Sequence, residues 1–119
     1  MSFIKKIKLN RQLKQTIEQY ADVTSRLKHE VRQCVTYKQY IKMHKEQGEN
    51  VSTLESEFRS RLGVVKSLRE QANVLRMNVH GIVADLSAEH GTESTAVEAR
   101  ISRAEAKQSA AEIMIDKEF

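Results

Sequence analysis

Residues 29–33, HEVRQ, begin like the helix of a zinc protease, with a histidine followed directly by a glutamate. Such a helix carries its second histidine four residues after the first, so that both imidazoles face one metal ion. Gln33 stands at that position here, so solvent-facing polar residues are the simpler interpretation. No two of the four histidines have helical ligand spacing, and no metal site is expected within one chain. They are His29, His44, His80 and His90.

Cys34 is the only thiol in the sequence. It falls within a regular series of apolar residues, which favours a buried, inert thiol over a reactive nucleophile. A single cysteine cannot form an internal disulfide, and this fits a reducing compartment. The sequence also lacks a glycine-rich phosphate loop. We therefore expect no enzymatic activity and no cofactor.

Two polar pairs interrupt the apolar series. If the first two helices lie antiparallel around a turn near Gly48, Lys38 faces Arg61 and Asn10 faces Glu89. Two cations in one core layer repel each other unless their stems pack and their charged heads reach water. In the functional alternative, Lys38 and Arg61 fix the register of the helices or bind an acidic partner.

The first fourteen residues, MSFIKKIKLNRQLK, combine apolar and basic side chains. The segment has three interpretations: the start of the first helix, a basic arm for nucleic acid or an acidic protein, and a membrane-surface segment. Base-stacking aromatic residues are scarce, which counts against single-strand binding. The apolar members are Phe3, Ile4 and Ile7, and the candidate binding residues are Lys5, Lys6, Lys8 and Arg11.

The last nine residues, AEIMIDKEF, contain the densest apolar cluster outside the first two predicted helices. Its members either dock on a protein partner or pack as an ordinary helix end. If they dock, deletion of residues 110–119 abolishes partner binding and leaves the first two helices paired. The cluster comprises Ile113, Met114, Ile115 and Phe119.

The composition is that of a protein built from long helices. The 119 residues include no proline and four glycines, and 30% of them are charged. Such a profile suits one domain of extended helices more than a compact mixed domain. Because no apolar run is long enough to span a bilayer and no secretory signal follows Met1, we expect a cytoplasmic location.

Mostly apolar residues recur at alternating steps of three and four in two long series. A spacing of 3.5 residues over several heptads is typical of a coiled coil, since an ordinary surface helix has a period of 3.6. The first series is Leu13, Ile17, Tyr20, Thr24, Leu27, Val31, Cys34, Lys38 and Ile41. The second is Val51, Leu54, Phe58, Arg61, Val65, Leu68, Ala72, Leu75, Val79, Ile82 and Leu86.

A phase slip between the two series predicts a turn at Gly48. Glycine suits the position after a helix C-cap, and Ser52–Glu55 reads as a capping box that starts the next helix. A turn centred between residues 49 and 50 pairs residues whose numbers sum to 99, as Leu27 does with Ala72. Every layer of the two series obeys this rule, which predicts a long antiparallel coiled-coil helical hairpin.

A shorter C-terminal helix completes the predicted fold, which is all-α. Gly91 suits the end of the second helix, and Thr95–Glu98 reads as another capping box. The third series is alanine-rich and buries little area, so this helix is the element expected to move or dock elsewhere. Its members are Val97, Ile101, Ala104, Gln108, Ala111 and Ile115. We predict a single helical domain over residues 1–119, with helices at about 4–47, 51–90 and 95–117.

Further apolar residues flank the two long series and widen the apolar face. A two-stranded coil needs only one apolar stripe, so the wider face predicts another strand, supplied by the third helix or by a second subunit. We therefore expect a homo-oligomer. The flanking residues are Ile7, Leu9, Val23, Val35, Tyr37, Leu62, Val64 and Val83.

The charge distribution favours an interaction protein. Residues 1–46 carry eleven Lys/Arg against four Asp/Glu, whereas residues 88–119 carry four against seven. The leading hypothesis is a non-enzymatic assembly or adaptor protein, a scaffold or chaperone, that oligomerises through the hairpin. Its termini would bind a larger protein complex. The alternative is a nucleic-acid-binding accessory protein that uses the basic face of the first helix and binds more weakly as salt rises.

Overall fold

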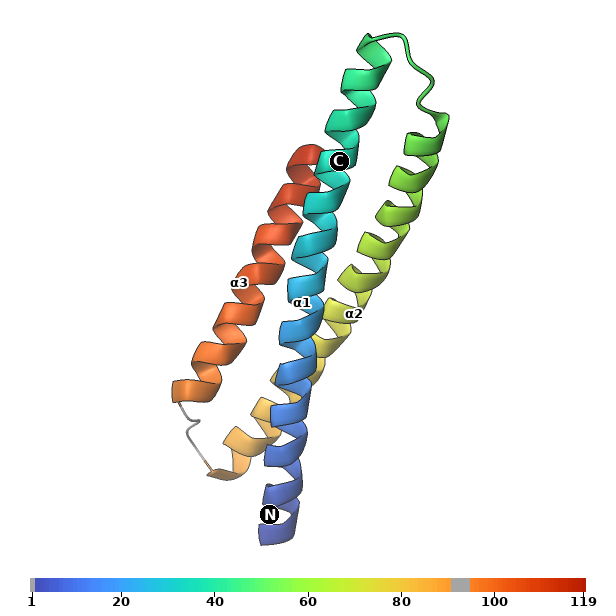
Figure 1. Cartoon of the computed structure of the whole chain (residues 1–119). Helices are drawn as coiled ribbons and strands as arrows, with labels where there is room; N and C mark the ends of the chain where they lie inside the picture. Colours follow the sequence, from blue (N-terminus) through green and yellow to red (C-terminus); the bar gives the residue numbers. More distant parts are fainter. Residues whose placement is uncertain (1, 91–94) are drawn as a thin grey trace.

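The computed structural model describes residues 2–90 and 95–119, and this part of the chain is almost entirely helical (Figure 1). Three helices follow one another: α1 from Phe3 to Glu46, α2 from Ser52 to His90 and α3 from Thr95 to Glu118. No strand occurs in the described ranges, so the all-α class is confirmed. The helix bounds lie within one residue of those predicted. Some predictions concern Gly91 and the side chains of Glu89 and Thr95. These lie outside the described part.

Both ends of α1 are capped by local hydrogen bonds. At its start, the Ser2 hydroxyl accepts a hydrogen bond from the Lys5 N–H at 3.1 Å. At its end, Gly48 has a φ of 75°, a left-handed conformation that glycine adopts without steric cost. The Gly48 N–H bonds to the Lys45 carbonyl at 3.1 Å, and the next N–H reaches the His44 carbonyl at 3.0 Å. These two bonds form a Schellman motif, which confirms the helix-ending position of Gly48.

The start of α2 differs from the predicted capping box. The Glu55 N–H donates to the Val51 carbonyl at 2.8 Å, so helical bonding already begins at Val51. Ser52 therefore lies within the first turn and cannot act as the cap. The Asn50 side chain takes over, because its Oδ1 accepts hydrogen bonds from the Ser52 N–H at 3.0 Å and from the Ser52 hydroxyl at 2.8 Å.

The α2 helix runs back along α1, and the two pack together through the predicted apolar series (Figure 1). Two buried threonines on α1 bond locally, Thr16 to the Gln12 carbonyl at 2.7 Å and Thr24 to the Ala21 carbonyl at 3.0 Å. Their hydroxyls therefore enter the interior without an unpaired donor. The buried members of the two long series include Leu13, Ile17, Tyr20, Leu27, Val31, Cys34, Val65, Leu68, Ala72, Val79, Ile82 and Leu86.

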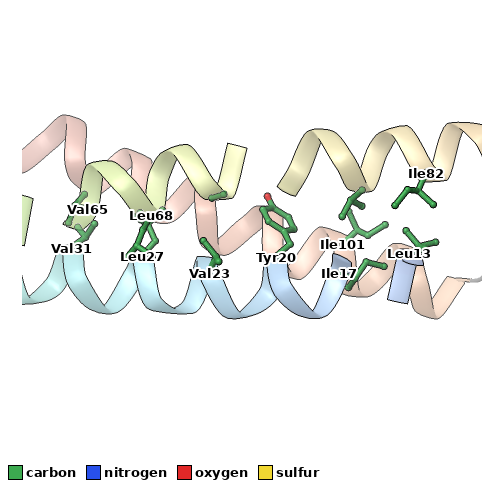
Figure 2. Close-up of a cluster of buried hydrophobic side chains, with 14 of the residues drawn as sticks. Leu13, Ile17, Tyr20, Val23, Leu27, Val31, Val65, Leu68, Ile82 and Ile101 are labelled. Atoms are coloured by element: carbon green, nitrogen blue, oxygen red, sulfur yellow. The ribbon is translucent and has the colours of Figure 1, made fainter. Parts of the chain in front are cut away.

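The pairing of α1 with α2 is offset by about one layer from the predicted register. Figure 2 shows Leu27 beside Leu68 and Val31 beside Val65, whereas the heptad pattern with a turn centred between residues 49 and 50 predicts Leu27 opposite Ala72. The reason is the path of the turn. In Figure 1, α1 extends past the start of α2, so the non-helical chain between them leads back along α1 before the second helix begins.

The α3 helix lies against α1 and completes an elongated bundle of 68 × 20 × 16 Å (Figure 1). Three more side chains, those of Val97, Met114 and Ile115, are partly buried against the same core. The predicted alanine-rich series therefore covers the protein's own first two helices. Its buried members are Ile101, Ala104, Gln108 and Ala111.

Candidate interaction surfaces

The side chains that could perform chemistry do not converge in the described part of the chain. No group of three or more His, Cys, Asp or Glu residues there is placed to hold a metal ion. Within HEVRQ, Glu30 forms an ion pair with Arg61 at 3.2 Å. His44 contacts Glu49, and His80 Nε2 lies 3.2 Å from a Glu105 oxygen, so each of these imidazoles has its own carboxylate.

Cys34 is completely buried, as predicted from its place in the first apolar series. Burial raises the pKa of its thiol, the Glu30 carboxylate raises it further, and the Arg61 guanidinium opposes the shift. The thiolate is the reactive form of cysteine. The net effect therefore keeps this thiol protonated and unreactive.

The predicted cationic layer of Lys38 and Arg61 does not form. Arg61 turns toward α1, where its Nη1 lies 3.2 Å from Glu30 and its guanidinium lies 5.1 Å from the centre of the Tyr37 ring. Tyr37 in turn donates a hydrogen bond from its hydroxyl to Glu57 at 2.7 Å. Lys38 is exposed on another side of α1. The pairing was wrong because of the one-layer offset between α1 and α2.

Lys38 contacts the end of α3 instead. Its ammonium donates a hydrogen bond to the Glu118 carbonyl and lies 5.8 Å from the centre of the Phe119 ring. The Phe119 ring also packs on Phe58 of α2, with 5.9 Å between ring centres. Two predicted binding residues, Lys38 and Phe119, thus form a contact between the end of α3 and the other two helices.

The other predicted docking residues at the C-terminal end separate into two groups. Met114 and Ile115 pack against the core of the bundle, which leaves little of them available to a partner. Ile113 is 66% exposed and projects away from that core. A helix presents successive residues on different faces, so adjacency in sequence did not make these side chains one surface.

A polar chain links all three helices, with Tyr20 and Gln108 buried and Asn73 exposed, and the sequence alone did not predict it. The Tyr20 hydroxyl donates a hydrogen bond to Gln108 Oε1 at 2.5 Å, and Gln108 Nε2 donates to Asn73 Oδ1 at 2.7 Å. Burial raises the pKa of Tyr20 to about 12. Two features of the sequence could have indicated this hydrogen bond: a glutamine within the alanine-rich series and a tyrosine within the first series. A buried tyrosine hydroxyl requires a hydrogen-bond partner.

Further polar contacts surround this chain at the edges of α3. Arg69 of α2 holds Glu112 through two nitrogens, at 2.8 Å and 2.6 Å from the carboxylate oxygens. On the other edge, Lys107 donates to the Ser25 hydroxyl of α1 at 3.2 Å. The α3 helix is therefore held by directional polar contacts as well as by small apolar residues.

The first turns of α1 form an exposed apolar and basic surface, here called the N-terminal surface. Figure 1 shows that this end of α1 extends past the end of α2. Phe3, Ile4 and Ile7 are 76%, 66% and 42% exposed, so none of them belongs to the buried core. The segment is thus an ordered part of α1 rather than an arm. The cations of this surface are Lys5, Lys6, Lys8, Arg11 and Lys14.

An apolar groove of about 530 Å³ lies between α1 and α2, and no residue of α3 lines it. Its floor includes the buried Val23 and the partly buried Leu75. Val74 is exposed along its edge, and polar side chains such as Gln19 and Gln71 complete the lining. This α1–α2 groove is a remaining part of the wide apolar face predicted from the sequence.

The end of the bundle that carries the turn also exposes apolar side chains. The α3 helix stops short of the turn (Figure 1), so only α1 and α2 form this part. Tyr40 and Met43, one helical turn apart on α1, are exposed there. We call this pair the turn-end surface.

No helix in residues 2–90 or 95–119 is long and apolar enough to cross a membrane. Comparison with protein-family models, with curated proteins and with solved structures finds no match for this chain.

Proposed function

We propose that this chain is a non-enzymatic assembly or adaptor protein of the cytoplasm. The observation that carries the proposal is the presence of separate exposed apolar surfaces on one rod 68 Å long. Scattered single apolar side chains are ordinary on protein surfaces, whereas grouped ones mark interaction sites. The proposed rod acts as a spacer that joins copies of itself and a protein partner.

The spacer in this proposal is an antiparallel coiled-coil hairpin of α1 and α2. Burial of residues at heptad spacing along both helices supports it. Spin labels at Arg26 and Gln71 test the arrangement in singly diluted, doubly labelled protein. The expected distance is the interaxial spacing of about 8–10 Å plus the two label arms. A distance of many tens of ångströms contradicts the hairpin.

Self-association is proposed to use the α1–α2 groove. Its apolar floor and the exposed Val74 form an apolar strip, on which a helix of a second copy packs in this proposal. Light scattering at micromolar concentration should give a dimer or larger species for the native chain, and Val74→Lys should shift it to the monomer. Met77→Lys serves as the matched control, since Met77 is an exposed apolar residue of the same helix that does not line the groove. A monomeric native chain contradicts this part of the proposal.

The protein partner is proposed to bind the turn-end surface. Affinity capture from the native cell, followed by cross-linking, compares the native chain with the double variant Tyr40→Ser/Met43→Ser. Because both side chains are exposed, the variant should keep its fold and lose the captured partner. The Met77→Ser variant should retain that partner. Capture that is equal in all three proteins would show that the turn end is not the binding site.

A nucleic-acid-binding accessory protein is the alternative function, favoured by the cations of the N-terminal surface. Its discriminator is the affinity for duplex DNA at low and at moderate salt. Phosphate binding releases counterions, so a genuine interaction must weaken steeply as salt rises. DNA binding with that salt dependence would replace the adaptor proposal.

A further inference from the structure

We propose that the N-terminal surface binds the surface of an anionic lipid bilayer. Three apolar side chains of α1 enter the acyl boundary, and the surrounding cations contact lipid phosphates. This inference goes beyond the adaptor function and does not rest on it. The inserting residues are Phe3, Ile4 and Ile7, and the phosphate-binding residues are Lys5, Lys6, Lys8, Arg11 and Lys14.

The apolar part of the surface points away from the protein's own core. Residues 3, 4 and 7 share one side of a helix, since positions three and four apart are neighbours. All three side chains are exposed, although they belong to a helix that begins with a Ser2 cap. The core face of α1 is instead marked by Leu13, which is buried. The fold therefore maintains a second apolar patch at the start of α1, outside the core.

The charge around this patch is of one sign. The first acidic residue of the sequence is Glu18, so five cations precede it without a carboxylate. Among the residues whose side chains the structure describes, no ion pair involves any of these five cations. A cluster of several Lys and Arg residues near an apolar patch complements the negative potential of a bilayer rich in anionic lipids.

The faces of α1 match insertion of its first turns. Amphipathic helices lie in the plane of the bilayer interface, with the apolar face about 5–10 Å into the headgroup and acyl boundary. In that orientation the side of α1 that carries Phe3, Ile4 and Ile7 enters the boundary, and the long lysine and arginine side chains beside it reach back to the phosphates. Because α1 extends past α2 at this end (Figure 1), the rest of the bundle does not obstruct the approach.

A bilayer fits this surface better than nucleic acid does. The phosphate backbone of a duplex attracts cations but offers no apolar layer for Phe3, Ile4 and Ile7. A bilayer supplies both an apolar layer and phosphates, which match the apolar and the basic side chains of this surface. The two partners therefore make opposite predictions for variants that remove only the apolar side chains.

Vesicle co-sedimentation of the full chain provides the test. The probes are vesicles of phosphatidylcholine alone and of phosphatidylcholine mixed with phosphatidylserine. We expect binding only to the mixed vesicles. The apolar variant Phe3→Ser/Ile4→Ser and the charge variant Lys5→Gln/Lys8→Gln should each weaken that binding by about tenfold or more. The control Met77→Ser removes an exposed apolar side chain of α2 that does not line the α1–α2 groove, and it should bind as the native chain does.

Insertion itself can be observed with a fluorescent reporter. The sequence contains no tryptophan, so Phe3→Trp introduces a single indole at the patch. Its emission should shift to the blue with mixed vesicles, and a reporter at Met77→Trp should not shift. Two results overturn the proposal: failure of the native chain to bind mixed vesicles, and equal binding by the apolar variant. In the second case, salt-sensitive binding of duplex DNA by both proteins would identify a nucleic-acid surface.

Discussion

The contact between α1 and α2 differs in kind from the contact that holds α3. Along α1 and α2, large apolar side chains such as Leu27, Val31 and Val79 are completely buried. The buried residues of α3 include two alanines and Gln108, and polar pairs line both of its edges. Apolar burial is non-directional and scales with area, whereas hydrogen bonds depend on geometry and protonation. The two contacts should therefore respond differently to cavities, pH and salt.

The largest effect on stability is expected when a large buried side chain is removed from the α1–α2 contact. Leu27→Ala removes a completely buried side chain and leaves a cavity, which should lower the free energy of unfolding by about 2–5 kcal/mol. Urea unfolding followed by circular dichroism measures it. Met77→Ala is the control, since an exposed position should change stability by no more than about 0.5 kcal/mol. Equal, small effects at both positions would mean that Leu27 is not buried in solution.

Alkaline pH should act on the contact with α3. Burial is the main cause that raises the pKa of Tyr20 from 10.0 to about 12, and the Glu105 carboxylate contributes. The folded chain then keeps the phenol proton while the unfolded chain loses it. The contribution of Tyr20 to stability is complete below about pH 10 and declines by roughly 2–3 kcal/mol as pH rises to about 12.

The comparison of native protein with Tyr20→Phe isolates this titration, because the lysines titrate equally in both. The difference in unfolding free energy between the two proteins should change steadily above about pH 10. A difference that stays constant across that range contradicts a buried, protonated Tyr20.

The buried hydrogen bond itself should have an intermediate effect. Gln108→Met keeps the approximate volume but leaves the buried Tyr20 hydroxyl without its acceptor, at a cost of about 1–3 kcal/mol. In the double variant Tyr20→Phe/Gln108→Met neither partner remains, so the combined loss should be smaller than the sum of the single losses. Strictly additive losses, measured by urea unfolding, would show that the two side chains do not interact.

The smallest effect is expected at the edge of α3. Arg69 and Glu112 side chains are 42% and 25% exposed, so Arg69→Ala should cost only about 0.2–1 kcal/mol, and less at high salt. Hydrogen exchange should nevertheless reveal the loss of this ion pair. The backbone amides of α3 should exchange faster in Arg69→Ala than in the native protein, whereas those at the α1–α2 contact should not. Uniform acceleration through all three helices would mean that α3 does not open separately.

Local physical chemistry determined much of the helical fold from the sequence. The 3.5-residue spacing identified most of the buried residues of α1 and α2, because a helix turns by a fixed angle at every residue. A glycine where the chain needs a left-handed conformation identified the end of α1. For the same reason the alanine-rich series identified the buried face of α3. Each of these features depends on residues close together in the chain.

Only the tertiary structure decided which of those faces meet. The register of α1 and α2 depends on the path of the turn, so a heptad pattern fits several layers equally well, and the predicted pairs were one layer away. Tyr20 and Gln108 are 88 residues apart, and no local pattern couples them. Likewise, Lys38 contacts the end of α3 rather than Arg61. Such contacts form only after three long helices pack at one register, because a shift of one layer moves every side chain by about one turn.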